Sequence, residues 1–298
     1  MILDGVDGAP RPARGTGRLR NVRGEPRYVR VDGVPHHVRV DGAGPLCVLS
    51  PGLGMSWFDW DRVVPLLAPR RTVVRFDRPG LGLSGPAPTW PTLRAEARRI
   101  GQILDALGLQ GPATVVGHSL AGFHAEAFAR LFPERTAGVV LVDSSVEEDP
   151  RLRGSRPARH GATRAVATLL GAVGVPSALL PRLRRAVVRA SRTGGGDPAP
   201  YTLVRGVYST RRALHAILAE NATYLDEALE LAALRREVPL PGVPVIVLAA
   251  GVPAWLDRQR ALAALLGGTF RVAEPSGHLV MLDRPKDIAD AVLELRTA

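Results

Sequence analysis

Short continuous apolar runs alternate with apolar residues at helical spacing along most of this chain. Runs of this kind, bounded by turn-forming residues, predict strands buried on both faces of a sheet. They are PLCVLS, RTVVRFD, ATVVGHS, AGVVLVD, VPVIVLAA and TFRVAEPS. Helical spacing predicts helices at about 92–107, 120–132, 257–266 and 284–296. Strands that alternate with helices predict an α/β fold, with a mostly parallel sheet, helices on both faces and right-handed crossovers.

The segment RYVRVDGVPHHVRVDG predicts two short alternating strands joined at Asp32-Gly33. An Asp-Gly pair between alternating apolar residues is a typical hairpin signal. We expect this hairpin, with His36 and His37, at an edge of the sheet.

Residues 148–236 interrupt the strand–helix rhythm. Apolar residues there recur at helical spacing, as at Leu214 and Leu218, without any strand-like run. The pattern predicts a helical insertion between two strands of the sheet. The predicted organisation is a flexible basic tail (1–26), an α/β core (27–147 and 237–298) and a helical cap (148–236).

Composition narrows the class of protein. The chain has 298 residues, 46% of them apolar, which suffices for a large core. Its one cysteine, Cys47, lies in a predicted strand and excludes a disulfide framework, as expected in a reducing compartment. The first 26 residues hold no apolar signal segment, and prolines and glycines break the longest uncharged runs. We therefore expect a cytoplasmic location and no transmembrane segment.

The net charge of +11 is unevenly distributed. Lys286 is the only lysine, and so strong a preference for arginine is typical of GC-rich codon usage, which weakens the case for nucleic-acid binding. Residues 151–215 hold thirteen arginines and one acidic residue, Asp197, a net charge of +12. Within them, helical spacing predicts that Arg185, Arg189 and Arg192 share one face. This face is either simply solvated, or it attracts an anionic substrate or an anionic lipid surface.

The stretch VVGHSLAGFH places Ser119 between a strand and a helix, two residues after Gly117. This order is the context in which the nucleophile motif G-x-S-x-G has meaning. A sharp turn there exposes the serine hydroxyl, and the following helix N-terminus offers backbone N–H groups to an oxyanion. Ala121 stands where the motif has its second glycine, and Gly122 follows. An ordinary serine in a strand–helix loop is the alternative.

Four segments together resemble the α/β-hydrolase fold family, in its capped, esterase-like form. They are the serine turn, VLSPGLGMSWFDW, FDRPGLGLSG and SGHLVMLDRP. The resemblance runs from Arg27 to Leu295, although Pro51-Gly52 stands where His-Gly is commoner. It implies no metal and no organic cofactor. It also implies that Ser119 is the nucleophile and His278 the general base, with the backbone N–H groups of Leu53 and Leu120 as the oxyanion hole.

The acid of the triad is where this chain departs from the family. The carboxylate expected after the last-but-one strand, near Ala254, is absent. Asp143, at the end of AGVVLVD, is the first candidate, because some family members supply the acid from that position. Asp257, which we expect to open a helix, is the second candidate. The third possibility is that neither aspartate supplies the acid. The chain order of serine, aspartate and histidine suits both candidates.

The resemblance predicts a serine hydrolase that cleaves a carboxylic ester or related acyl bond of a small molecule. Serine at the nucleophile position argues against epoxide hydrolase chemistry, which uses aspartate there. Lactonase, thioesterase and perhydrolase activities stay open, as does a non-catalytic binding protein, because a fold does not fix the substrate. We expect Asp77 and Arg78 to shape their loop, and Trp57 and Trp60 either to line the acyl pocket or to pack in the core.

Overall fold

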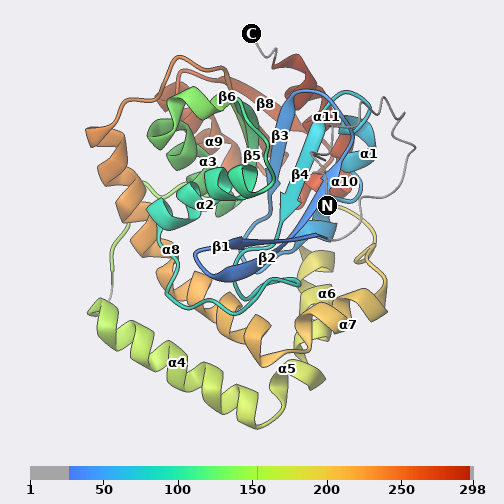
Figure 1. Ribbon diagram of the computed structural model, residues 1–298, viewed down its shortest axis with the longest axis vertical. Coiled ribbons are helices and arrows are strands. Elements are labelled where there is room, and N and C mark those ends of the chain that lie inside the picture. The colour runs from blue at the N-terminus through green and yellow to red at the C-terminus, as the bar shows by residue number, and fades with distance from the viewer. Residues whose placement is uncertain (1–26, 153, 296–298) are drawn as a thin grey trace, which may run out of the picture.

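The computed structural model describes residues 27–152 and 154–295; the tail predicted for residues 1–26 lies outside them. Its sheet runs in the order β1-β2-β4-β3-β5-β6-β7-β8 (Figure 1). The strands are β1 (Arg27–Val31), β2 (Val34–Asp41), β3 (Leu46–Ser50), β4 (Thr72–Phe76), β5 (Ala113–His118), β6 (Thr136–Val142), β7 (Val245–Ala250) and β8 (Thr269–Ala273). β2 pairs antiparallel with β1 and β4, and the other pairs are parallel. The predicted α/β fold class is confirmed.

The predicted hairpin forms at an edge of the sheet, and its two histidines lie on the inner strand of the pair. Asp32 (φ 49°) and Gly33 (φ 78°) make the turn that pairs β1 with β2, as a two-residue hairpin requires. β1 is the edge strand, whereas β2 lies between β1 and β4. His36 and His37 are therefore fully buried, and His37 Nδ1 lies 2.8 Å from Asp77 Oδ2. The hairpin therefore lies at an edge of the sheet as predicted, and its inner strand, β2, carries both histidines into the interior.

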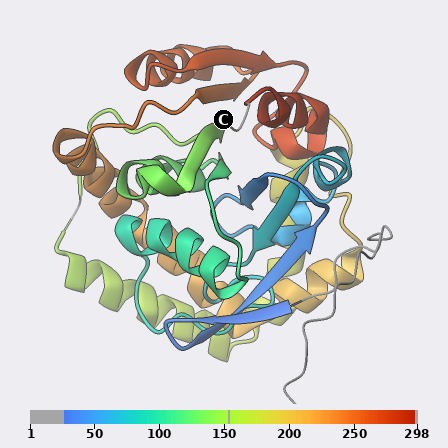
Figure 2. The same cartoon turned by 45° about the horizontal axis from the view of Figure 1, so that its top comes forward.

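Helices cover both faces of the sheet (Figures 1 and 2). One face carries α2 (Leu93–Ala106), α3 (Ala121–Leu131) and α9 (Pro253–Leu265), and the other carries α1 (Val64–Leu67), α10 (Val280–Asp283) and α11 (Pro285–Glu294). Each face has its own apolar core. Burial of these branched and aromatic side chains is the main stabilising contribution to the fold. Cys47 lies in the second core, where burial raises its thiol pKa to about 12.

One helix begins earlier than predicted. The expected start near residue 257 was wrong, because α9 starts at Pro253. Proline has no N–H to lose in the first helical turn, and its fixed φ suits that position. Asp257 consequently lies beyond the first turn of α9 rather than at its start.

Between β6 and β7 the described chain is helical. The helices are α4 (Arg156–Ala172), α5 (Val175–Ala178), α6 (Leu180–Ala190), α7 (Tyr201–Tyr208) and α8 (Arg211–Glu237). They lie at the lower end of the molecule in Figure 1, and α8 extends from there to the side of the sheet. A third apolar cluster joins Trp57 and Phe58 of the 3-10 helix η1 (Trp57–Trp60) to α6, α7 and α8. Trp60 is fully buried in the second core, so both tryptophans pack in apolar clusters.

A second 3-10 helix, η2 (Pro133–Arg135), leads into β6. Within residues 27–152 and 154–295, no helix is both long enough and apolar enough to cross a bilayer.

Candidate active site

Ser119 occupies the sharp turn between β5 and α3. Its φ of 52° is in the left-handed region, which residues other than glycine adopt rarely. Three backbone hydrogen bonds hold it there: its N–H donates to Val142 O (3.1 Å), and its carbonyl accepts from Gly122 N (2.9 Å) and Ser145 N (3.1 Å). Such strain persists only where surrounding contacts impose it, and it is commonly found at functional sites. The residue is half-buried and lines a cavity.

Glycines on either side of the turn allow the close packing that it needs. A Cβ on Gly117 would overlap the carbonyl of Ala121, and a Cβ on Gly122 would overlap the hydroxyl of Ser144. Ala121 itself is fully buried and accommodated. The close approach on the helix side therefore falls at Gly122, one residue later than the usual motif places its glycine.

Asp143 and His278 meet at the ends of different strands. His278 Nδ1 lies 2.6 Å from Asp143 Oδ2, while Asp143 Oδ1 accepts a hydrogen bond from Ala250 N–H at 2.9 Å. The backbone N–H of Asp143 donates to Leu248 O at 2.8 Å, which extends the β6–β7 pairing to this residue. Asp143 is buried, whereas the side chain of His278 is 42% exposed. A buried carboxylate held by the sheet thus orients an accessible imidazole.

The alternative acid lies elsewhere. The side chain of Asp257 on α9 is 90% exposed and pairs with Arg260, with 2.7 Å between Oδ1 and Nη1. Of the two candidates left open by the sequence, the structure brings Asp143, not Asp257, to His278.

His118 contributes a contact that the sequence did not reveal. Its Nε2 lies 3.0 Å from the carbonyl oxygen of His278, so the neutral ring donates from Nε2 and leaves a lone pair on Nδ1. Within the described residues that Nδ1 is buried without a hydrogen-bond partner. Burial, and then the nearby His278, hold the pKa of His118 well below its usual value of 6.5. His118 therefore supports the backbone of His278 as a neutral ring.

Replacing His118 with glutamine should flatten the loss of stability in acid. Below pH 6.5 the imidazole of His118 binds a proton in the unfolded chain but stays neutral in the folded protein. The free energy of unfolding therefore falls as the pH falls. Glutamine removes this titration and keeps an N–H donor for His278 O. Denaturant unfolding between about pH 7 and pH 5 should show a shallower decline in the variant than in the parent. Equal declines in the two proteins would contradict the lowered pKa of His118. His36, whose pKa is also lowered, is present in both proteins, so its contribution cancels in the comparison.

The two residues predicted to form the oxyanion hole, Leu53 and Leu120, both lie near Ser119. Leu120 directly precedes α3, and Leu53 lies in the loop after β3 and lines the same cavity as Ser119. Among the described residues neither N–H donates to a protein acceptor. A Cβ on Gly52 would lie only 3.1 Å from Ser119 Cβ, so this loop passes directly against the serine turn. Free donors at this place suit a developing oxyanion.

A buried ion pair holds the loop that carries Leu53. Arg78 donates through Nη1 to Pro51 O and through Nη2 to Gly52 O (2.7 Å), and its Nε lies 2.5 Å from Glu220 Oε1. Glu220, on α8, accepts the N–H of Gly54 at 2.8 Å. We call Arg78 and Glu220 the loop clamp, because they fix the backbone on both sides of Leu53. The sequence predicted loop architecture for Arg78 but did not reveal its partner.

Asp77 shapes its own loop as predicted. Its carboxylate accepts the N–H groups of Trp57 (3.0 Å) and Leu83 (3.1 Å). A Cβ on Gly82 would overlap that carboxylate, so glycine is required there.

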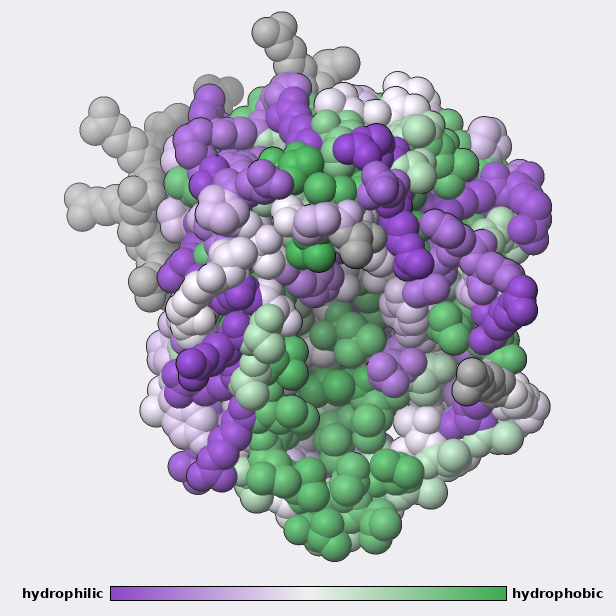
Figure 3. Space-filling model, turned by 180° about the vertical axis from the view of Figure 1, so that it is seen from behind, coloured by the Kyte–Doolittle hydropathy of each residue, from purple (hydrophilic) through white to green (hydrophobic). Residues whose placement is uncertain are grey.

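The cavity at Ser119 is about 300 Å³ and mainly apolar. Its lining includes Leu53, Met55, Leu180, Val188, Ile217 and Leu279, besides His118, Ser119 and His278. Figure 3 shows a hollow with an apolar floor on the face opposite to that of Figure 1. Arg184 also borders the cavity, but it is paired with Asp59, with 2.5 Å between Nη2 and Oδ1.

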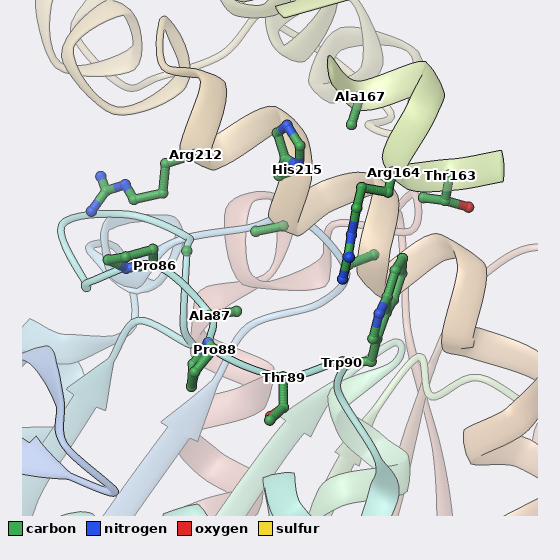
Figure 4. A pocket seen from close by; sticks show the side chains of 13 residues that line it. Pro86, Ala87, Pro88, Thr89, Trp90, Thr163, Arg164, Ala167, Arg212 and His215 are labelled. Carbon is green, nitrogen blue, oxygen red and sulfur yellow. The ribbon is translucent and has the colours of Figure 1, made fainter. Parts of the chain in front are cut away.

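Figure 4 shows a separate cavity of about 270 Å³, between the 86–90 loop and helices α4 and α8. Its lining includes Trp90, Arg164 and His215 and none of the residues predicted to be catalytic. Within the described residues, no group of three or more His, Cys, Asp or Glu side chains is arranged to hold a metal ion.

Not all of the arginines predicted on one face of α6 are on it. α6 ends at Ala190, and Arg192 lies beyond it, 2.8 Å from Asp283 Oδ1. Asp283 also accepts the N–H of Gly277, next to His278. Arg192 therefore ties the segment that follows α6 to the histidine loop, while Arg185 and Arg189 are exposed. The predicted three-arginine face was wrong at Arg192, because an ion pair holds that side chain inward.

A comparison with protein families decides the classification. A family model described as the alpha/beta hydrolase family matches residues 47–291. The chain belongs to the α/β hydrolase family. Among curated relatives, this α/β hydrolase is 32% identical over 111 residues to a candidate carbamate hydrolase of Azorhizobium caulinodans, covering 37% of this chain and 42% of the relative. It is 27% identical over 250 residues to homoserine O-acetyltransferase of Thermus thermophilus, covering 68% of this chain and 58% of the relative.

A third relative, epoxide hydrolase B of Mycobacterium tuberculosis, is 37% identical over 100 residues, covering 33% of this α/β hydrolase and 28% of the relative. The chain thus aligns with less than two thirds of the length of each of these relatives. Among solved structures, the epoxide hydrolase CorEH matches with a TM-score of 0.73 at 21% identity, covering 91% of this chain and 97% of that one. The enol-lactonase from Burkholderia xenovorans LB400 matches with a TM-score of 0.62 at 24% identity, covering 90% of this chain and 99% of that one. These structures support the fold alone.

Proposed function

We propose that this α/β hydrolase is a serine hydrolase that cleaves a carboxylic ester or related acyl bond through an acyl-enzyme. The observation that carries the proposal is the 2.6 Å contact between His278 and the buried Asp143, in a site where Ser119 sits on a strained turn facing an apolar cavity. Serine, an oriented imidazole and free backbone donors are the parts that nucleophilic acyl transfer requires.

In the proposed reaction, the Ser119 hydroxyl oxygen attacks the acyl carbon while His278 Nε2 takes its proton. The carbonyl oxygen becomes an oxyanion, which the N–H groups of Leu53 and Leu120 stabilise. Collapse of the tetrahedral intermediate breaks the ester bond, and His278 returns the proton to the leaving alcohol. Water then attacks the acyl-enzyme by the same route, which releases the acid and restores Ser119. Asp143 keeps the imidazole in the required tautomer and stabilises its charged form.

The lining of the cavity favours an uncharged, apolar acyl group. Arg184, which borders the cavity, is neutralised by Asp59 and stacks over the rings of Phe58 and Tyr208, each 5.3 Å from its guanidinium carbon. It therefore offers little attraction to an anionic acyl chain. The relatives named for epoxide chemistry do not determine the reaction of this chain, since the family resemblance associates aspartate, rather than serine, with that chemistry at the nucleophile position.

A fluorophosphonate probe and an ester panel test this proposal. The probe should form one covalent adduct, located at Ser119 by peptide mass spectrometry. A series of p-nitrophenyl esters of increasing acyl length should show hydrolysis with an optimum set by the cavity. Failure of the probe to react, with no ester hydrolysed by the folded protein, would favour a non-catalytic binding protein instead.

The loop clamp should influence turnover more than substrate binding. Glu220→Gln leaves the buried Arg78 without its charged partner and weakens the hold on the loop carrying Leu53. We expect kcat for an activated ester to fall by about tenfold to a hundredfold, with a smaller change in KM, because the N–H of Leu53 acts mainly on the transition state.

Glu126→Gln is the matched control for this variant. Glu126 is a buried carboxylate on α3 that pairs with Arg130 and Arg235, away from the cavity. The Glu126→Gln substitution should lower the denaturant midpoint of unfolding while kcat changes by less than about twofold. Parallel losses of kcat in the two variants would show that the clamp only stabilises the fold.

A further inference from the structure

A group of exposed apolar side chains lies on cap helices α4 and α6 and beside them. We call it the cap patch: Val166, Leu169, Val173, Leu179, Leu183 and Val187, each between 48% and 67% exposed. Figure 3 shows apolar side chains gathered at the lower, cap end of the molecule and continuing upward into the hollow. Contiguous exposed apolar surface of this kind marks an interaction site more often than an ordinary surface.

The spacing of the patch residues places them on one side of each helix. Val166 and Leu169 of α4 and its C-cap residue Val173 recur at i, i+3 and i+7. The N-cap residue of α6, Leu179, and Leu183 and Val187 on the helix recur at i, i+4 and i+8. The linking helix α5 has four residues and spans only about 6 Å. Val173 lies two residues before α5 and Leu179 directly after it, so this short helix links the two rows.

The cap patch reaches the mouth of the candidate active site. Leu183 and Val187 line the cavity that contains Ser119 and His278, although each residue is more than half exposed. The apolar surface is therefore continuous from the outside of the cap to the nucleophile.

Arginines without acidic partners flank this apolar surface. Arg182, Arg185 and Arg189 are exposed on α6, and none of them pairs with a carboxylate among the described residues. The surrounding residues 151–215 have a net charge of +12. An occupant of this surface must therefore be apolar in part and anionic.

Two other occupants fit less well. A second copy would bring a like charge of +12 against the first, which repels it. Residues 1–26 hold five arginines and three acidic residues, so they do not supply an anionic partner either. We infer that the cap docks on an anionic phospholipid surface. The cap patch enters the boundary between headgroups and acyl chains, and the three arginines contact lipid phosphates.

Docking of this kind goes beyond the proposed function and requires no catalysis. Where the proposed function also holds, an ester dissolved in the bilayer would enter the cavity between Leu183 and Val187 without crossing water. Binding is therefore measured on the full chain with Ser119→Ala, so that a failure of the proposed chemistry cannot be mistaken for a failure of docking.

Co-sedimentation with phosphatidylcholine vesicles, with or without about one third phosphatidylglycerol, tests the inference. The protein should bind only the anionic vesicles, and less as salt rises. Arg182→Gln, Arg185→Gln and Arg189→Gln together should lower the partition coefficient on the order of a hundredfold. Leu169→Ser, Val173→Ser and Leu179→Ser together should lower it at least tenfold, because these side chains lie outside the cavity but within the patch.

Matched triple variants on the α/β core are the controls. Arg27→Gln, Arg70→Gln and Arg98→Gln remove the same charge from exposed positions, and Leu66→Ser, Val252→Ser and Leu265→Ser remove comparable exposed apolar side chains. Neither set should change binding more than about threefold. Three results would each overturn the inference: no binding to anionic vesicles, equal losses in the patch and control variants, or a dimer in solution that the patch variants dissociate.

Discussion

Ester hydrolysis should disappear when Ser119 is replaced by alanine, with a fall in kcat of about 10⁴-fold or more. The reason is chemical: the variant lacks the hydroxyl that attacks the acyl carbon in the proposed reaction, while the backbone hydrogen bonds that hold the turn do not involve the side chain. Alanine also has a Cβ, as serine does, so the strained φ of 52° is not relieved. Initial rates on an activated ester, with circular dichroism to verify folding, measure the effect.

Ser144→Ala is the matched control for Ser119→Ala. Ser144 is a buried serine beside Gly122, and its hydroxyl donates to the carbonyl of Ser145 at 3.2 Å. Its loss should leave kcat within about tenfold of the parent. If Ser119→Ala also retains activity within that range, Ser119 is not the nucleophile.

The second large effect is expected at Asp143. Asparagine there presents an amide to His278 Nδ1, which favours the wrong tautomer and no longer stabilises the imidazolium; in serine proteases this change costs about 10⁴ in kcat. The substitution suits the backbone, because asparagine tolerates the positive φ of 40° as well as aspartate does. Its amide oxygen can still accept the N–H of Ala250, so the fold should survive.

Asp257→Asn is the comparison variant, since Asp257 was the other candidate in the sequence. It removes an exposed charge paired with Arg260, and such surface pairs contribute little to stability. Activity should change by less than about twofold. A greater loss from Asp257→Asn than from Asp143→Asn, with both proteins folded, would transfer the orienting role to Asp257.

The sequence alone determined the fold class, and it placed the candidate nucleophile, Ser119, at a strand–helix turn. Buried parallel strands must be apolar along their whole length, and the helices between them must be apolar on one side, so both patterns appear in the local sequence. The turn at Ser119 is equally local, because Gly117, Ser119 and the helix that follows are neighbours in the chain. The family resemblance depended on such short segments, and the family match over residues 47–291 agrees with it.

Only the tertiary structure distinguished Asp143 from Asp257, by bringing the first and not the second against His278. Both aspartates precede His278 in the chain, and the choice depends on how β6, β7 and the loop after β8 lie in the sheet, which sequence spacing does not encode. The same holds for contacts between distant segments: Glu220 reaches the loop after β3, His118 supports His278, and Arg192 leaves the face of α6 for Asp283. Each is an interaction of side chains across more than ninety residues or between separate elements, and local periodicity carries no information about such partners.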